Sequence, residues 1–465
     1  MGASPRDVVV VGASLGGLFA AAALARPGTR VTVVERDELP EHPAPRAGVP
    51  QGRQPHVLLH RGLVAMEQLL PGVRDDLLRA GAVALDTGDL AWLNEPGWAT
   101  PVREYGVVSA TRPLVEHVVR QRVLALRGVR LVQGTRVQGL ARGVGGRAWS
   151  VDTTRREGHA VVRRERLEAD LVVDASGRAS RLPLWLSELG VEPARRHKVD
   201  ARVGYATQVL ELPHDRVAAA GVVVLQRAGA RGGLALPVEG DRWLVAGVGA
   251  GELRPSRADL RTFLGLVPDP ALAQLVDAGH LVGDVAVHRQ TGNLRHDYHR
   301  VHDWPDGLLV LGDALCCFNP VYGQGIAVAA LEAVELRDAD ASGRLGRPGG
   351  ARRLLGRFAS VVDVPWGIAT GTDLRLPTTE GRLTGLDAAF SSWTQELTRL
   401  AAHGDRTVQR SLSAVYHLAA PPTTLLRPRL LAHALRARVT GVGPGVPRPQ
   451  ILAPAQARRD SAATS

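Results

Sequence analysis

The chain is poor in cysteine and contains almost no lysine. Its 465 residues include two cysteines, the neighbours Cys316 and Cys317, and one lysine, Lys198. Adjacent cysteines seldom bridge each other, so a disulfide framework is excluded and a reducing compartment fits. The N-terminus has no basic stretch followed by an apolar one, and the longest apolar run, Leu15 to Ala25, is shorter than the ~20 residues that span a bilayer. We therefore expect a cytoplasmic protein with no stable membrane anchor.

Several enzyme signatures are also missing. The sequence has no G-x-S-x-G motif and no Cys/His spacing typical of a metal site, which argues against the main hydrolase and metalloenzyme classes, and no metal is expected. The net charge of +11 is concentrated at one end, because no acidic residue lies between Asp405 and Asp460, where nine arginines occur. No helix-turn-helix, RRM or zinc-finger pattern accompanies this charge, so we expect no nucleic-acid partner.

The first 35 residues have the pattern of a β-α-β unit that binds a dinucleotide. Val8–Val11 is a continuous apolar run typical of a strand buried on both faces, 15–26 predicts an alanine-rich helix, and 30–34 predicts a second strand. Between the first strand and the helix lies Gly-Ala-Ser-Leu-Gly-Gly, a turn that can expose backbone N–H groups to a pyrophosphate at the helix N-terminus. The candidate cofactor ligands in this turn are Gly12, Ser14, Gly16 and Gly17.

The end of the second strand supplies two more candidates. Glu35 lies 23 residues after Gly12, where a carboxylate can accept hydrogen bonds from both hydroxyls of a ribose. Arg36 follows it and is a further candidate ligand. The alternative for Glu35 is a solvated strand end. Ser14 replaces the middle glycine of the G-x-G-x-x-G motif and leaves slightly less room for the phosphate, so the unit by itself suits either NAD or FAD.

A second glycine-rich segment distinguishes these cofactors. Residues 312–325 read Gly-Asp-Ala-Leu-Cys-Cys-Phe-Asn-Pro-Val-Tyr-Gly-Gln-Gly, between a predicted strand at 307–311 and a predicted helix at 327–336. This segment resembles the second FAD fingerprint of the class A flavoprotein monooxygenases and their squalene-epoxidase-like and polyether-epoxidase-like relatives. The resemblance implies a carboxylate that holds the ribityl hydroxyls and a turn that aims N–H groups at the flavin N1–C2=O edge. The implied FAD ligands are Asp313, Pro320, Gly323, Gln324 and Gly325.

Two arginines are candidate FAD ligands by the same resemblance. Arg46 begins the segment Arg-Ala-Gly-Val-Pro-Gln-Gly, where the family has an arginine that reaches the FAD phosphates. Arg112 resembles the arginine of a family helix beside the ribityl and phosphate groups, and a surface arginine is the alternative. The related epoxidases often carry two alternating histidines after the first segment, but here Gln54 replaces one and only His56 remains. A lone histidine is more typical of a structural role, so no catalytic residue is assigned.

The electron source is expected to differ from that of the aromatic hydroxylases. Those enzymes carry a D-G motif, linked to both FAD and NAD(P)H, at the place of residues 170–180. Here Ser176 replaces the aspartate of that motif, and Asp174 lies two residues earlier. We therefore expect reduction by NAD(P)H either directly but slowly until substrate is bound, or through a separate flavin reductase.

The predicted fold class is α/β, with a Rossmann-like FAD-binding domain, an inserted and mainly antiparallel β-sheet substrate domain, and a helical C-terminal region. The predicted limits are 1–85, 105–195 and 293–350 for the discontinuous FAD-binding domain, 86–104 and 196–292 for the substrate-binding sheet domain, 351–440 for the helical region, and 441–465 for a disordered tail.

The resemblance also implies the chemistry. In this family reduced flavin and O₂ form a C4a-hydroperoxide, whose distal oxygen is transferred to the substrate while the protein excludes water. The predicted substrate sheet is rich in Val, Leu, Ala and Gly, which favours a small apolar substrate such as a polyketide or terpenoid. The predicted function is therefore an FAD-dependent monooxygenase that epoxidises or hydroxylates such a substrate. The alternatives are an FAD-dependent reductase of a polyprenyl or polyketide double bond and a non-catalytic flavin-binding protein.

Overall fold

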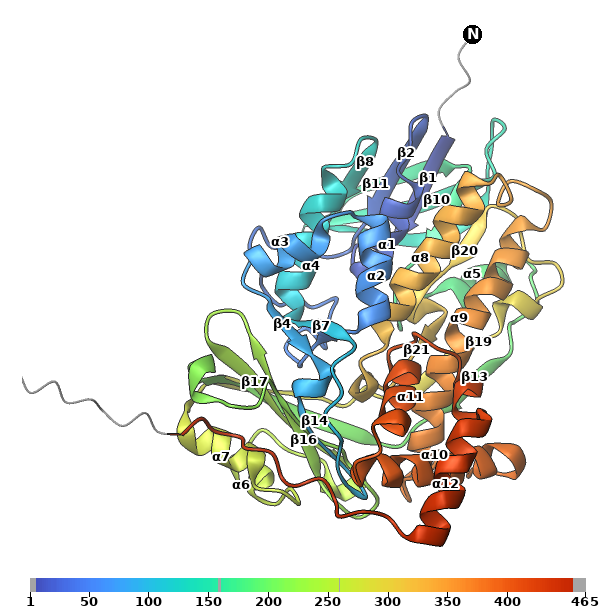
Figure 1. Cartoon of the computed structure of the whole chain (residues 1–465). Coiled ribbons are helices and arrows are strands. Elements are labelled where there is room, and N and C mark those ends of the chain that lie inside the picture. Colours follow the sequence, from blue (N-terminus) through green and yellow to red (C-terminus); the bar gives the residue numbers. More distant parts are fainter. Residues whose placement is uncertain (1–5, 158–159, 259, 455–465) are drawn as a thin grey trace, which may run out of the picture.

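The computed structural model describes residues 6–157, 160–258 and 260–454. A parallel sheet of five strands, which we call the central sheet, has the order β20-β12-β1-β2-β8 and lies in the upper part of the molecule as drawn in Figure 1. The strands consist mostly of valine and leucine, because both faces of the sheet are covered. Their limits are β1 Arg6–Val11, β2 Thr29–Val34, β8 Val129–Val132, β12 Leu171–Asp174 and β20 Leu308–Val310. The α/β class predicted from the sequence is confirmed.

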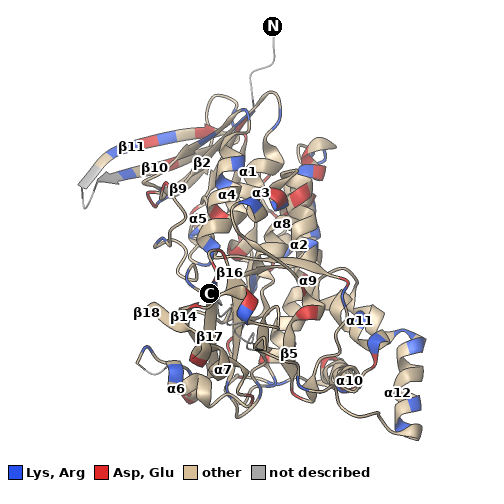
Figure 2. Cartoon of the chain, turned by 60° about the vertical axis from the view of Figure 1, so that its left-hand side comes forward, with Lys and Arg blue, Asp and Glu red and all other residues tan. Residues whose placement is uncertain are grey.

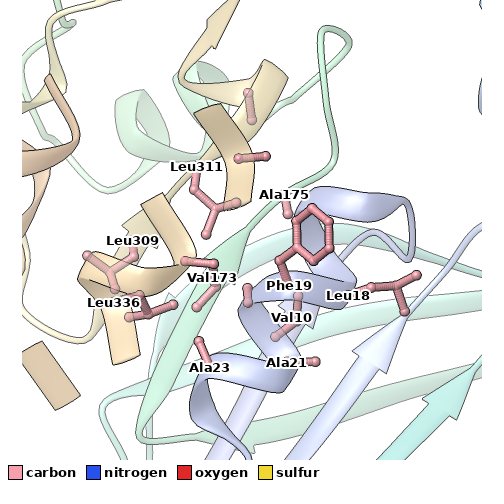
Figure 3. Close-up of a cluster of buried hydrophobic side chains, with 14 of the residues drawn as sticks. Val10, Leu18, Phe19, Ala21, Ala23, Val173, Ala175, Leu309, Leu311 and Leu336 are labelled. Atoms are coloured by element: carbon pink, nitrogen blue, oxygen red, sulfur yellow. The ribbon is translucent and has the colours of Figure 1, made fainter. Parts of the chain in front are cut away.

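Two helices that are far apart in the sequence cover one face of this sheet together. Helix α1 (Leu15–Leu24) packs against α8 (Gly325–Ala341), and α8 also contacts α2 (His60–Leu69). Phe19 of α1 and Leu336 of α8 are fully buried, and they lie over Val10 and Val173 of the central strands (Figure 3). This packing brings the N-termini of α1 and α8, which follow the two predicted FAD segments, to the same end of the sheet.

A small antiparallel sheet lies beside the central one. Its strands have the order β11-β10-β9, and β11 and β9 contact β1 and β2. Their limits are β9 Thr135–Arg142, β10 Trp149–Glu157 and β11 Ala160–Ala169. Three further helices are α3 Val73–Arg79, α4 Arg112–Leu124 and α5 Leu182–Glu188.

The largest sheet has seven strands in the order β18-β14-β17-β16-β15-β5-β6, all antiparallel except for the β15–β5 pair. Helices α6 (Leu260–Gly265) and α7 (Ala271–Ala278) pack on it. Along β14, Tyr205 and Ala206 belong to different buried clusters, so both faces of the sheet are covered. The strand limits are β5 Ala91–Asn94, β6 Gly97–Trp98, β14 Val203–Glu211, β15 Val222–Val224, β16 Gly232–Val238, β17 Arg242–Ala250 and β18 His280–His288. The domain limits stated above remain predictions.

Two three-stranded sheets, β3-β7-β4 and β13-β19-β21, complete the β structure of the described residues. Their limits are β3 Val57–Leu58, β4 Val83–Asp86, β7 Gly106–Ser109, β13 Arg196–Val199, β19 Asn293–His296 and β21 Cys316–Cys317. Both cysteines of β21 are buried and free.

The C-terminal part is helical, and none of the helices in the described ranges has the length and apolar character needed to cross a membrane. Its helices are α9 Gly350–Asp373, α10 Gly385–Ala402, α11 Arg406–Tyr416 and α12 Pro428–Thr440. Several arginine positions are spaced along α12, which lies at the edge of the molecule (Figure 2).

The segment that follows α12 differs from the prediction of a disordered tail. Residues 441–454, which we call the C-terminal strap, run back to α7 and the seven-stranded sheet (Figure 1). Ile451 is 2% exposed, Leu452 forms an antiparallel bridge with Val217, and Arg448 pairs with Asp269 at 2.9 Å. The strap is rich in Gly and Pro, which is typical of disordered segments, so the sequence did not indicate these contacts. The remaining residues of the predicted tail, 455–465, lie outside the described residues.

Candidate functional site

The turn between β1 and α1 requires glycine at two positions. Gly12 has a φ of +99°, and a Cβ there would lie 2.6 Å from the carbonyl oxygen of Ala175. A Cβ on Gly17 would lie 1.8 Å from the carbonyl oxygen of Gly12, whereas Gly16 has more room. Ser14 is the N-cap of α1, but its side chain makes no cap hydrogen bond. The first-turn N–H groups of α1 therefore remain available to an anionic ligand.

Glu35 faces this glycine turn and is 5% exposed, so it is not a solvated strand end. Its Oε2 accepts a hydrogen bond from the Ala13 N–H at 2.7 Å, and its Oε1 accepts one from the Asp37 N–H at 3.0 Å. The carboxylate is thus fixed against the turn, next to the position expected for an adenosine ribose.

Arg46 is held so that one end of its guanidinium stays free. Its side chain is 7% exposed, Nε donates to Glu116 at 2.6 Å, and Nη1 donates to Asp37 at 2.8 Å. Nη2 is buried and has no hydrogen-bond partner among the described residues. Burial lowers the pKa of Arg46, but the neighbouring carboxylates of Glu116 and Glu35 outweigh this effect and raise it. A phosphate oxygen would satisfy Nη2.

Arg112 is buried as well, which excludes the surface alternative. Its side chain is 8% exposed, Nη2 donates to the Ser14 hydroxyl at 2.7 Å, and Nε lies 3.4 Å from Glu116. Glu116 therefore bridges both arginines. We call the connected side chains the phosphate-side network, and its members are Ser14, Glu35, Asp37, Arg46, Arg112 and Glu116.

The cavity against the phosphate-side network has a volume of about 10 Å³, roughly the room of one water molecule. Arg46, Arg112 and Glu116 line this cavity together with Pro40 and Val49.

Asp313 lies at the other end of the site, in the turn that follows β20. Its carboxylate is partly buried and receives no hydrogen bond within the part of the chain that the structure describes. Burial raises the pKa of Asp313, and the positive charges of Arg178 and Arg112 oppose this shift. A Cβ on Gly325 would lie 3.8 Å from Asp313 Oδ1, so the glycine keeps the space between the carboxylate and the start of α8 open.

The six residues 320–325, which we call the flavin turn, connect Asp313 to α8. Pro320 begins a short 3₁₀ turn, Gly323 has a φ of +67° in the left-handed region that favours glycine, and Gly325 begins α8. Gln324 is 1% exposed, and neither its Nε2 nor its Oε1 has a partner in the described ranges. Unsatisfied buried polar atoms are costly, so their presence at Gln324 and at Arg46 fits a polar ligand between the two.

Arg36 is more exposed than the other candidate ligands, and its role as an FAD ligand remains a prediction. The Arg36 side chain is 45% exposed, and its Nε lies 3.9 Å from Asp37, at the margin of the phosphate-side network. The Nδ1–H of His56 donates to the Gln54 carbonyl at 2.8 Å, and burial and the Arg112 charge lower its pKa to about 3. This neutral histidine fits the structural role.

Gln54 attaches its loop to the substrate sheet. It is 3% exposed, donates to the carbonyl of Ala286 at 3.1 Å, and accepts a hydrogen bond from the Thr207 hydroxyl. The segment at 170–180 is likewise tied internally, because Asp174 accepts hydrogen bonds from Ser176 and from the Ser180 hydroxyl. The Asp174 carboxylate is fully buried and holds the turn after β12.

Residues 6–339 of the chain match the family model described as FAD binding domain. The chain belongs to this FAD-binding family. Protein Rv3254 from Mycobacterium tuberculosis (strain ATCC 25618 / H37Rv) is 34% identical over 354 residues, which cover 72% of this chain and 73% of that protein. FAD is therefore the cofactor, and its contacts with individual residues remain predictions.

Solved structures of flavoproteins share the fold. PqsL, a probable FAD-dependent monooxygenase from Pseudomonas aeruginosa, is 19% identical with a TM-score of 0.58, over 80% of this chain and 97% of its own. The p-nitrophenol 4-monooxygenase PnpA from Pseudomonas putida DLL-E4 is 16% identical with a TM-score of 0.57, over 92% of this chain and 97% of its own. At these identities the likeness concerns the fold.

The structure adds residues to the candidate site that the sequence did not single out. Glu116 lies one helical turn after Arg112, so the i,i+4 spacing was a usable signal. Asp37 follows Glu35 by two residues, and this closeness to an expected ligand was also a usable signal. Arg178, whose charge acts on Asp313, had no such signal. Across the described ranges, no group of three His, Cys, Asp or Glu side chains is arranged to hold a metal ion.

Proposed function

We propose that the protein is an FAD-dependent monooxygenase that inserts one atom of O₂ into an apolar, natural-product-like substrate by epoxidation or hydroxylation. Bound FAD supplies the activation of O₂, and the protein holds the substrate and excludes water. The observation that carries this proposal is the contact between the flavin turn and an apolar face of the seven-stranded sheet.

Val321 of the flavin turn packs against this face, together with Leu376 from the segment after α9. The other members of the cluster come from β14, β16 and β17 and the residues next to them. They are Ala201, Val203, Tyr205, Leu234, Val248 and Ala250. A flavin bound at the turn would therefore lie beside side chains that favour an apolar substrate and disfavour water.

One polar group interrupts this apolar surface. The hydroxyl of Tyr205 is buried and has no hydrogen-bond partner in the described part of the chain, and its ring stacks on His288 with 5.6 Å between the centroids. A substrate with a single hydrogen-bonding oxygen would satisfy the Tyr205 hydroxyl. This supports an oxygenated polyketide or terpenoid over a pure hydrocarbon.

The electrons come from NAD(P)H, either directly or through a separate flavin reductase. Asp174 is engaged with Ser176 and Ser180, so it is not free to contact a reductant as the family's D-G aspartate does. We place the reaction in the cytoplasm, where both sources of electrons exist.

The test is oxygenation with labelled O₂. The FAD-loaded protein is supplied with NADPH, with and without a flavin reductase, under ¹⁸O₂ and with a panel of polyketide and terpenoid alkenes. A product that carries one ¹⁸O atom, with matching O₂ uptake, is expected. A hydrogenated product formed without O₂ would instead support the double-bond reductase. No turnover of any alkene by the reduced protein would contradict both.

A further inference from the structure

Asp373, the last residue of α9, contacts the flavin turn. Asp373 is fully buried. Its Oδ1 accepts a hydrogen bond from the Tyr322 hydroxyl at 2.8 Å and one from the Asn319 amide at 3.1 Å. Its Oδ2 accepts a hydrogen bond from the Asn293 amide at 2.6 Å. The Asp373 carboxylate thus accepts hydrogen bonds from a side chain of β19 and from side chains on both sides of Pro320.

The two asparagines extend this contact to the backbone of the turn. The Oδ1 of Asn293 accepts a hydrogen bond from the Asn319 N–H at 2.7 Å, and the Oδ1 of Asn319 accepts one from the Val321 N–H at 3.3 Å. The side chains of Asn319 and Tyr322, which lie on either side of Pro320, are therefore both linked to Asp373. We call Asn293, Asn319, Tyr322 and Asp373 the turn-support cluster.

The cluster places a negative charge near the flavin. All of the side-chain contacts to Asp373 are donated by a hydroxyl or an amide, and an ionised carboxylate accepts such hydrogen bonds most strongly. Burial raises the pKa of Asp373, and the hydrogen bonds from Tyr322, Asn293 and Asn319 oppose this shift. No ion pair to Asp373 is formed within the described residues, so hydrogen bonds alone balance its charge.

We propose that Asp373 is a positioning residue for FAD, which fixes the flavin turn through Tyr322 and Asn319 and keeps a negative charge behind the flavin. The charge disfavours the build-up of negative charge on the reduced flavin and so lowers its midpoint potential. Asp373 lies beyond residues 6–339, the part of the chain that matches the FAD-binding family model. The C-terminal helices therefore take part in the cofactor site. The proposal depends on FAD binding and not on the identity of the substrate.

Two variants separate the effect of the charge from that of the geometry. Asp373→Asn removes the charge and one acceptor, and Tyr322→Phe removes one hydrogen bond but keeps the charge. Asp363→Asn is the matched control, because Asp363 lies on the same helix, is 60% exposed and pairs only with Arg295. For each protein we would measure the FAD dissociation constant, the midpoint potential of the bound flavin and the thermal midpoint of the FAD-free form.

Asp373→Asn should weaken FAD binding by about tenfold or more, as expected for the loss of a charge-assisted hydrogen bond, and shift the midpoint potential to more positive values. Tyr322→Phe should weaken FAD binding by a few-fold with an almost unchanged potential. The control should match the wild type in both. A lowered thermal midpoint with wild-type affinity and potential in Asp373→Asn would show a merely structural role and overturn the proposal.

If Asp373→Asn does not fold, Tyr322→Phe decides, and wild-type FAD affinity in this variant would also overturn the proposal. Oxygenated product enters none of these measurements. Failure to find a substrate would therefore count against the proposed function and leave the role of Asp373 unaffected.

Discussion

Replacing Asp313 by asparagine should have opposite effects on FAD binding and on the stability of the FAD-free protein. The substitution keeps the size of the side chain and removes its charge. If Asp313 holds the ribityl hydroxyls, its loss removes a charge-assisted hydrogen bond worth about 1.5–3 kcal/mol. The FAD dissociation constant should then rise by roughly ten- to a hundredfold. Asp313→Ala should also lose most of its flavin while remaining folded.

Without FAD, the Asp313 carboxylate is partly buried and receives no hydrogen bond from the described residues, so its ionised form is unfavourable. Asp313→Asn should therefore stabilise the FAD-free protein by about 1 kcal/mol, a rise of roughly 2 °C or less in a chain of this size. Because the pKa is raised in the folded state, the native protein binds this proton more tightly than the unfolded chain. The cost is present above the folded-state pKa and is relieved as the pH falls through it, so the advantage of the variant should shrink on acidification.

The assay combines fluorescence titration with FAD and thermal denaturation of the FAD-free proteins at several pH values. Asp303→Asn is the control, because Asp303 is 88% exposed and contacts only His302. Equal FAD affinity in Asp313→Asn and the wild type would show that Asp313 is not the ribityl ligand. A lower thermal midpoint in the FAD-free variant would show instead that the carboxylate has a stabilising partner.

Three further outcomes can be checked with the same material. Heating should release FAD and not FMN, because FMN lacks the adenosine ribose that Glu35 is expected to hold, and a flavin that runs as FMN on chromatography would contradict this assignment. Arg46→Ala should weaken FAD binding by about tenfold or more without changing the product, because the free Nη2 of Arg46 is expected to contact phosphate. An altered product with normal FAD content would place Arg46 at the substrate. In anaerobic stopped-flow mixing, NADPH alone should bleach the flavin slowly, whereas bleaching within milliseconds without substrate would refute the expected dependence on substrate or a reductase.

The parts of the fold that could be predicted are those where local chemistry dictates the backbone. The apolar run at 8–11 predicts a buried strand, and the glycines at 12 and 17 predict the tight turn after it. Gly17 is required there because any side chain would overlap the backbone of Gly12. Glu35 and Arg112 were candidates individually, and the structure brings their side chains into one network with Arg46. Their roles as FAD ligands remain predictions.

The parts that could not be predicted depend on contacts between distant segments. Asp373 lies 51 positions after Tyr322, at the end of a helix whose sequence gives no sign that this carboxylate is buried. Ile451 lies beside Leu452 in a Pro- and Gly-rich stretch, and such a stretch carries no periodic pattern. Burial of one side chain by a remote partner leaves no local trace in the sequence.

The C-terminal strap makes the last helices and the seven-stranded sheet mechanically dependent on each other. Its backbone is attached at two points near Ile451, where the Ala218 N–H donates to the Ile451 carbonyl at 2.9 Å and the Ala453 N–H donates to the Arg216 carbonyl at 2.9 Å. A chain cut at residue 440 would lose both attachments and uncover the apolar surface that Ile451 fills, whereas an affinity tag added after residue 465 would leave them in place. Truncations that remove the C-terminal strap are therefore expected to weaken the attachment of the last helices to the seven-stranded sheet.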